Sequence, residues 1–280
     1  MKLQLKDRSI ELNRPLIMGI LNVTPDSFSD GGLYVTRDRA LAQAERMIKE
    51  GADIIDIGGE STRPGAAEVS PEQEMERVCP VVEELKNSFD TVISVDTSQP
   101  AVIRQCADLG ADIWNDIRAL SVEGAVDTAL ELRLCVCLMH MQGQPRTMQD
   151  NPHYEDVVGE VRDFLLQRAR VLTDRGFERE RIIIDPGFGF GKSAQDNYRL
   201  LCHLEDLAGT GYTLLSALSR KSMIGFANHI EKASERVPGS VAGAVISVLK
   251  GANIVRVHDV EPTRQALEVF EQMNRYAAAR

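Results

Sequence analysis

The phrase 51-GADIIDI-57 recurs along the chain as 110-GADIWND-116 and 251-GANIVRV-257, and it decides the fold class. Each copy follows a segment with helical spacing, such as 38-DRALAQAERMIKE-50. Glycine is common just past a helix end, where the backbone turns left-handed, and a β-branched run behind it is typical of a strand. The repeat therefore predicts a helix, a glycine stop and then a strand.

The same pattern, followed along all 280 residues, predicts eight strands separated by helical segments. The predicted strands span 16–22, 53–58, 92–96, 113–117, 134–139, 181–185, 212–218 and 254–258. Strands that alternate with helices pair in parallel, and eight such units favour a closed (β/α)₈ TIM barrel. A doubly wound open sheet is the alternative.

Residues 1–13 precede the first of these strands. Apolar residues at alternate positions flank a charged turn at 6–8, which predicts a β-hairpin that caps the lower end of the barrel. No low-complexity tract or Pro/Gly linker divides the chain. We therefore expect residues 1–280 to form a single domain.

Charge and hydropathy limit the class of partner. The formal net charge is −10 and no Lys/Arg-rich block occurs, so we expect no nucleic-acid partner. The first residues carry charge throughout, and no apolar segment approaches the ~20 residues that span a bilayer. The sequence predicts a cytoplasmic protein with no membrane partner.

Five cysteines lie at scattered positions and do not form a disulfide framework. Cys135, Cys137 and His140 lie close together in 134-LCVCLMH-140, where zinc binding is one interpretation. However, the paired C-x-x-C spacing is missing, and free cysteine is among the most buried residue types. We favour a structural role for these cysteines.

The ends of the predicted strands carry polar residues. In a parallel barrel, the side chains that do chemistry come from the carboxyl ends of the strands and the loops after them. Here these residues are Asn22, Glu60, Asp96, Asn115, Asp116, Met139, His140, Asp185, Lys221, Arg256, His258 and Asp259. Because buried charges are costly unless paired, their convergence indicates a binding site, with mutual salt bridges as the alternative explanation.

Part of this set suits a flat ring. Asp96, Asn115 and Asp185 supply carboxylate and amide acceptors for a ring that presents several N–H groups. Phe190 and Met139 could contact its two faces. The sequence predicts a nitrogen-rich ring as ligand.

The other part suits a phosphate with its metal ion. Arg63, Arg256 and His258 are expected around the phosphate, since the guanidinium fork matches phosphate geometry. The amide oxygen of Asn22 is a ligand type that Mg²⁺ accepts. A nitrogen-rich ring beside a diphosphate is the predicted substrate.

The run 187-GFGFGKS-193 imitates a phosphate-binding loop. Its first glycine position is occupied by Pro186, and the G-x-G-x-x-G spacing is also absent. We reject both nucleotide motifs and expect the glycines to let the backbone approach a flat ligand, with Phe190 covering it.

With these residues in view, the sequence resembles the dihydropteroate synthase family almost from end to end. The matching motifs are 18-MGILNVTPDSFSDGG-32, 58-GGESTRPGA-66, 94-SVDTS-98, 115-NDI-117, 138-LMHMQG-143, 184-IDPGFGFGK-192, 219-SRKSMIG-225 and 256-RVHDV-260. The resemblance implies a (β/α)₈ barrel. It also implies a transferase that joins 6-hydroxymethyl-7,8-dihydropterin diphosphate to 4-aminobenzoate with Mg²⁺, releasing diphosphate and 7,8-dihydropteroate.

The resemblance also implies residue roles. The pterin is expected to contact Asp96, Asn115, Asp185, Lys221, Met139 and Phe190, and the diphosphate Thr62, Arg63, Arg256 and His258. The aminobenzoate, with which sulfonamide drugs compete, is expected at Phe28, Pro64, Phe190 and Ser219, and the metal at Asn22. Catalytic roles fall to Asp96, Lys221, Arg63, Arg256 and His258.

The chemistry expected of such a site is dissociative. Departure of diphosphate would leave a pterin cation, and a neutral aromatic amine needs no strong base to attack it. The loops at 23–32 and 61–70 are expected to exclude water, with Asp26 or Asp30 supplying a carboxylate in the closed state.

One departure from the family pattern concerns pterin affinity. Ala217 stands where the family commonly has glycine, and the added methyl group could tighten or displace the ring.

Two other functions share parts of the pattern. A corrinoid-dependent methyltransferase pterin domain would not need the diphosphate residues, and a non-catalytic pterin-binding barrel would keep the ring pocket but lose the lid or metal residues. A homodimer is expected from the resemblance, through C-terminal helices such as 239–251.

Overall fold

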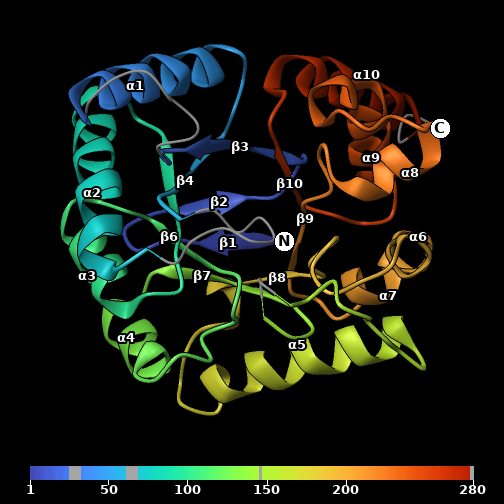
Figure 1. The fold of residues 1–280 in the computed structure, drawn as a ribbon, viewed down its shortest axis with the longest axis horizontal. Helices are drawn as coiled ribbons and strands as arrows, with labels where there is room; N and C mark the ends of the chain where they lie inside the picture. The colour runs from blue at the N-terminus through green and yellow to red at the C-terminus, as the bar shows by residue number, and fades with distance from the viewer. Residues whose placement is uncertain (25–32, 61–68, 145–146, 278–280) are drawn as a thin grey trace.

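The computed structural model describes residues 1–24, 33–60, 69–144 and 147–277. Eight parallel strands close into a barrel in the order β10-β3-β4-β5-β6-β7-β8-β9, and helices surround it (Figure 1). The strands are β3 (Leu16–Asn22), β4 (Ile54–Gly58), β5 (Val92–Asp96), β6 (Ile113–Asp116), β7 (Cys135–Met139), β8 (Ile182–Asp185), β9 (Thr213–Ser216) and β10 (Ile254–Val257). The predicted TIM barrel is confirmed, and the open-sheet alternative is wrong.

Helices lie between successive strands, as the repeat predicts. They are α1 (Leu33–Lys49), α2 (Pro71–Ser88), α3 (Pro100–Asp108), α4 (Ala125–Leu132), α5 (Val157–Thr173), α6 (Ala194–Cys202), α7 (Leu204–Ala208), α8 (Ser222–Asn228), α9 (Val237–Leu249) and α10 (Val260–Ala277). Short 3₁₀ turns occupy η2 (Arg179–Arg181) and η3 (Ala233–Glu235). Within the described ranges, no helix has the length and apolar character needed to cross a bilayer.

The glycine of each repeated phrase ends a helix in the same way. Gly51, Gly110 and Gly251 have φ angles of +96°, +103° and +98°. The N–H of the following residue then bonds to a carbonyl five residues back, as Ala52 does to Met47 at 2.9 Å. A left-handed glycine with this bond is the Schellman stop, because only glycine adopts that φ without strain. The predicted glycine stop is confirmed.

The third residue of each phrase ties its strand to the strand before it. Its side-chain oxygen accepts the N–H of a residue on that strand, and its own N–H donates to the carbonyl of the same residue. The pairs are Asp53 with Ile17 at 2.9 Å, Asp112 with Ile93 at 3.0 Å, and Asn253 with Leu214 at 2.9 Å. Three strand junctions are thus fixed in register by a short polar side chain at the strand start.

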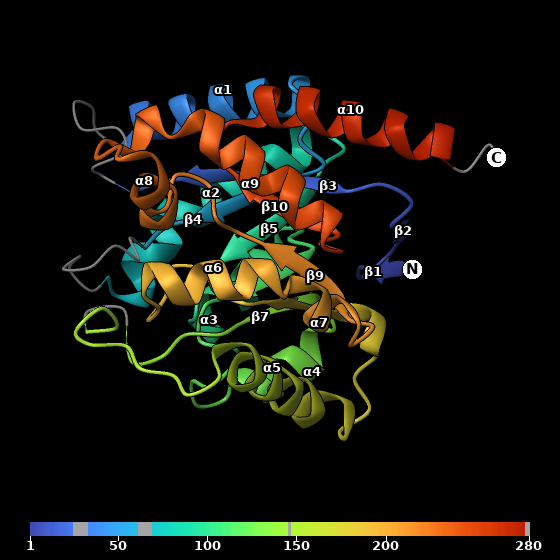
Figure 2. The same cartoon turned by 90° about the vertical axis from the view of Figure 1, so that its right-hand side faces the viewer.

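The N-terminal hairpin closes one end of the barrel. Strands β1 (Lys2–Gln4) and β2 (Ser9–Glu11) are antiparallel. Leu3 and Leu5 are fully buried in a cluster with inward-facing strand residues, and the Leu5 carbonyl accepts a bond from Arg181 at 2.8 Å. Figure 2 shows the hairpin at the opposite end from α8 and the connection that leads from β7 to α5. The predicted cap is confirmed, and the other end is left for the site.

The strand tie predicts different outcomes for two substitutions at Asp112. Asp112→Ala should lower the free energy of unfolding by about 1–3 kcal/mol, because the buried N–H of Ile93 loses its acceptor. Asp112→Asn should cost clearly less, since the amide oxygen of Asn253 fills the same role in the third phrase. Urea unfolding followed by circular dichroism measures both. Equal losses for the two variants would contradict the tie.

Candidate active site

Four adjacent strands end in a row at the open end of the barrel. Asn22 on β3 pairs with Gly58 on β4, Gly58 pairs with Asp96 on β5, and Asp96 pairs with Asn115 on β6. Neighbouring residues in a parallel register face the same side of the sheet. The structure therefore brings Asn22, Asp96 and Asn115 together, although they are far apart in the sequence.

Arg256 lies at the centre of this end. Its Nε donates to the Asp56 carboxylate at 2.6 Å, and its Nη2 donates to Asp96 at 2.7 Å. Asn115 donates its amide to the same oxygen of Asp56 at 3.1 Å. The Asp56 side chain is fully buried, whereas the Arg256 side chain is 17% exposed. The salt-bridge explanation is therefore correct for part of the set, with Arg256 as the shared cation.

Asp56 is the site residue that the sequence analysis missed. It occupies the sixth position of the repeated phrase, and the same position holds Asn115 in the second copy and Arg256 in the third. Asp56 accepts a hydrogen bond from each of the other two. Alignment of the three copies would have shown a polar residue in the middle of each strand, which is the signal for an inward-facing group.

The charged groups in this cluster shift one another's pKa values. Burial raises the pKa of Asp96 to about 7, with Arg256 opposing the shift and Asp56 adding to it. Burial also disfavours the charge on Arg256, but Asp56 and Asp96 outweigh it, so the pKa of Arg256 lies above its usual value. A carboxyl group whose pKa lies near 7, beside a permanently charged guanidinium, is typical of a functional site.

Asp185 and Lys221 form a second group on the far side of the barrel. Burial raises the pKa of Asp185, and Lys221 opposes the shift. Burial lowers the pKa of Lys221 to about 8, with Asp185 opposing. Lys221 lies 4.7 Å from the centre of the Phe190 ring, and Met139 pairs with Asp185 across β7 and β8. Four of the residues expected around a flat ring, Asp185, Lys221, Phe190 and Met139, are therefore brought together on this side.

Ser219 and His258 form a third contact at the ends of the last two strands. The Ser219 Oγ lies 3.1 Å from His258 Nδ1 and accepts the backbone N–H of His258 at 3.2 Å. Burial lowers the pKa of His258 to about 4, and Arg256 adds to the shift. The imidazole is therefore neutral near pH 7, and a proton on Nε2 leaves Nδ1 to accept from the Ser219 hydroxyl.

The corner formed by Asn22 and Asp96 fits a hard cation. A Cβ at Gly58 would lie 3.7 Å from Asn22 Oδ1 and 3.6 Å from Asp96 Cβ, in ordinary van der Waals contact, so the two side chains lie on either side of Gly58. An amide oxygen and a carboxylate are the donor types that Mg²⁺ takes while it keeps most of its waters. These residues therefore fit the expected metal.

Several predicted residues cannot be placed. Phe28, Thr62, Arg63 and Pro64 lie outside the described residues, as do Asp26 and Asp30. Their roles stay predictions.

Four other residues from the sequence analysis are buried. Cys135 and Cys137 belong to the inner cluster of the barrel, and the Nδ1 of His140 contacts Lys192 at 3.0 Å. Ala217 lies in the same inner cluster and is 5% exposed. It therefore lies in the barrel interior, where an added methyl group must be accommodated by packing.

The fold and these clusters define a TIM-barrel enzyme with acidic, amide and cationic groups gathered at the carboxyl ends of its strands. The family described as "Pterin binding enzyme" matches residues 18–258. The chain is 54% identical over 271 residues to the dihydropteroate synthase of Haemophilus influenzae, covering 97% of this chain and 98% of that protein.

Two solved structures are also similar. The Yersinia pestis dihydropteroate synthase with a sulfonamide drug complex has a TM-score of 0.92 and 49% identity, covering 98% of this chain and 99% of that one. The Xanthomonas albilineans enzyme with 4-aminobenzoic acid has a TM-score of 0.92 and 47% identity, covering 98% of both chains. This chain belongs to the dihydropteroate synthases of the pterin-binding enzyme family.

Proposed function

We propose that this protein joins 6-hydroxymethyl-7,8-dihydropterin diphosphate to 4-aminobenzoate, with release of diphosphate, by a dissociative route assisted by Mg²⁺. The observation that carries the proposal is the gathering of Asp96, Asn115, Asp185 and Lys221 around one barrel end, with Arg256 between them. A methyltransferase-type or non-catalytic pterin barrel would need the ring pocket alone.

Ring recognition follows from hydrogen-bond chemistry. Asn115 and Asp185 offer acceptors to the N–H groups of the pterin, and Lys221 offers a donor to its ring nitrogen and oxygen acceptors. Phe190 and Met139 supply apolar contacts for the two faces. The bound ring then holds its methylene carbon in one position relative to the diphosphate, which is the main requirement for the reaction.

The reaction breaks the bond between the methylene carbon and the diphosphate oxygen, and both electrons leave with the oxygen. The Asp96 carboxylate stabilises the cation left on the pterin. Arg256 and the Nε2–H of neutral His258 stabilise the leaving diphosphate. The amine lone pair then forms the new C–N bond, and its proton passes to solvent.

We propose that Asn22, with Asp96 beside it, would hold Mg²⁺, which would neutralise charge on the diphosphate. We propose that Thr62 and Arg63 complete the diphosphate site. The aminobenzoate site is proposed to contain Phe28, Pro64 and Ser219.

We also infer that residues 1–280 form a single domain and that the protein is cytoplasmic.

A homodimer is part of the proposal. Large apolar side chains are exposed on α9 and on α10, which pack against each other. Their exposed fractions are Ile246 43%, Leu249 58%, Val269 72% and Met273 52%. Exposed large apolar side chains on two packed helices are more typical of a subunit interface than of free solvent exposure.

Turnover with substituted amines tests the dissociative route. The protein should form 7,8-dihydropteroate and release diphosphate when the pterin substrate, 4-aminobenzoate and Mg²⁺ are all present. Across ring-substituted 4-aminobenzoates of very different basicity, kcat should change by less than about threefold, because bond breaking precedes attack. A rate that rises steeply with amine basicity would contradict this route, and a protein that forms no 7,8-dihydropteroate would contradict the function.

Sedimentation equilibrium tests the dimer. Leu249→Glu should convert the dimer to a monomer at micromolar concentration, because it places a charge within the apolar face. Asn87→Glu, on the exposed side of α2, is the control and should stay dimeric. A monomeric wild-type protein would rule the dimer out.

A further inference from the structure

The segment 186–191, here called the 186–191 loop, follows β8 and carries Phe190. Gly187, Gly189 and Gly191 have positive φ angles of +67°, +81° and +62°. A Cβ at Gly187 would lie 1.9 Å from the His140 carbonyl oxygen, and one at Gly191 would lie 2.4 Å from that of Gln142. The loop is therefore pressed against the chain that follows β7, with no room for side chains in between.

Five consecutive carbonyl groups of this loop accept hydrogen bonds from side chains outside it. The donors are Lys192 to Gly187 and Phe190, Lys221 to Phe188, Gln149 to Gly189 and Tyr154 to Gly191. Loop carbonyls usually bond to water, because connecting segments lie on the surface. The 186–191 loop is instead held as a fixed wall of the site.

Lys192 makes the largest share of these contacts. It is 2% exposed, and its Nζ lies 3.0 Å from the carbonyl oxygens of Gly187 and Phe190. The same Nζ lies 3.0 Å from His140 Nδ1 and 3.3 Å from the His140 carbonyl oxygen. One ammonium group therefore joins both sides of the loop to the end of β7.

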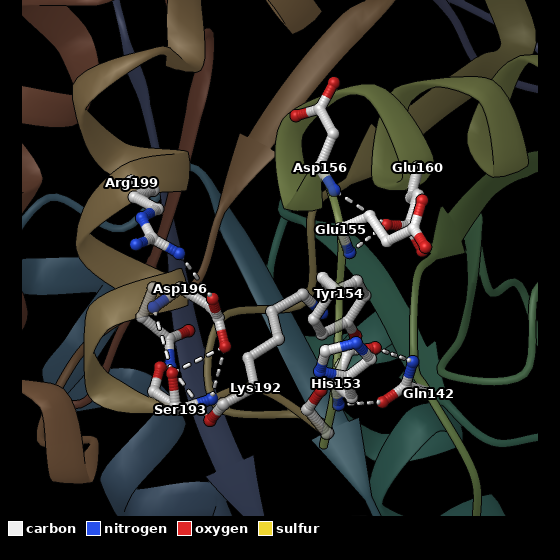
Figure 3. Close-up of polar contacts among 12 residues, drawn as sticks. Gln142, His153, Tyr154, Glu155, Asp156, Glu160, Lys192, Ser193, Asp196 and Arg199 are labelled. Atoms are coloured by element: carbon white, nitrogen blue, oxygen red, sulfur yellow. Dashed lines mark hydrogen bonds and ion pairs between the residues drawn. The ribbon is translucent and has the colours of Figure 1, made fainter.

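The surroundings of Lys192 are also fixed. Figure 3 shows its side chain running from the start of α6 toward Tyr154, on the connection that leads to α5. Gln142 and His153 hold that connection together through two bonds, at 2.8 and 3.0 Å. At the start of α6, the Ser193 Oγ donates to Asp196 at 2.5 Å and accepts its backbone N–H at 3.1 Å.

The charge of Lys192 has no close counterion among the residues that the structure describes. Within the described part of the chain its contacts are carbonyl oxygens and an imidazole, and no ion pair within 4.0 Å involves it. Burial lowers its pKa to about 7, with the more distant Asp185 opposing. A buried cation without a close counterion is costly, so its retention here calls for a function.

The position of the loop determines where two groups of the ring pocket lie. Phe190 belongs to the loop, and Lys221 donates to the Phe188 carbonyl at 2.5 Å while lying over the Phe190 ring. If the loop moved away from β7, the phenyl ring and the Lys221 ammonium would move with it. Both are residues that the proposed function assigns to the pterin.

We propose that Lys192 is a positioning residue for pterin binding: its ammonium fixes the 186–191 loop on the end of β7 and so sets where Phe190 and Lys221 meet the ring. This inference rests on the proposed function. This role differs from that of the lysine in a phosphate-binding loop, because the Lys192 ammonium donates its hydrogen bonds to backbone carbonyls of the protein and not to a bound phosphate.

The test compares Lys192→Met with the wild type. Binding of 6-hydroxymethylpterin, which fluoresces, should weaken by about tenfold or more, the loss expected when a set of charged hydrogen bonds is removed. Amide hydrogen exchange should accelerate in the 186–191 loop and stay unchanged in β5. In steady-state turnover, KM for the pterin substrate should rise more than kcat falls. Lys250→Met, which removes a surface ion pair with Glu205, is the matched control and should leave all three values unchanged.

Tyr154→Phe is the second variant, for the case that Lys192→Met does not fold. It removes only the bond to Gly191 and should weaken pterin binding by about two- to fivefold, with faster exchange in the loop. Unchanged pterin affinity and loop exchange in a folded Lys192→Met, or in Tyr154→Phe if the first variant does not fold, would overturn the inference. A wild-type protein that does not bind pterin would instead overturn the proposed function.

Discussion

The site depends on a guanidinium shared between two carboxylates. Arg256 on β10 reaches Asp56 on β4 and Asp96 on β5, and Asn115 on β6 completes the contact to Asp56. Without this cation, Asp56 and Asp96 would be two buried negative charges with no ion-pair partner among the described residues, which favours protonation of at least one of them. The ring pocket therefore owes its charge state to one residue on the last strand of the barrel.

The repeated phrase explains how such a cluster arises in a barrel. Its glycine ends the helix, its third residue fixes the register with the preceding strand, and its sixth residue points into the barrel near the open end. Because the three copies place their strands at different points around the barrel, their sixth residues meet across it. The same local pattern thus supplies both the stability of the strand starts and the chemistry of the strand ends.

The sequence predicted the barrel well, because helix stops and β-branched runs are local signals. The predicted strand at 92–96 agrees with β5, and that at 212–218 is longer than β9 at both ends because the buried apolar run continues past the last paired residue. The convergence of Asp96, Asn115, Asp185 and Lys221 was also predictable, since parallel strands end on one side. Asp56 was missed because a single acidic residue in a buried strand carries no signal until the three copies are aligned. The role of Lys192 could not be predicted, because its acceptors are backbone carbonyls, which leave no pattern in the sequence.

Asp56 gives the most direct test of the shared guanidinium. The measurement is kcat/KM for the pterin diphosphate in Asp56→Asn, with Asp53→Asn as a control on the same strand at the other end of the barrel. The account predicts a loss of about tenfold or more for Asp56→Asn, because Arg256 and Asn115 lose a charged acceptor, and a change within about twofold for Asp53→Asn. Equal kcat/KM values for Asp56→Asn and the wild type would contradict it.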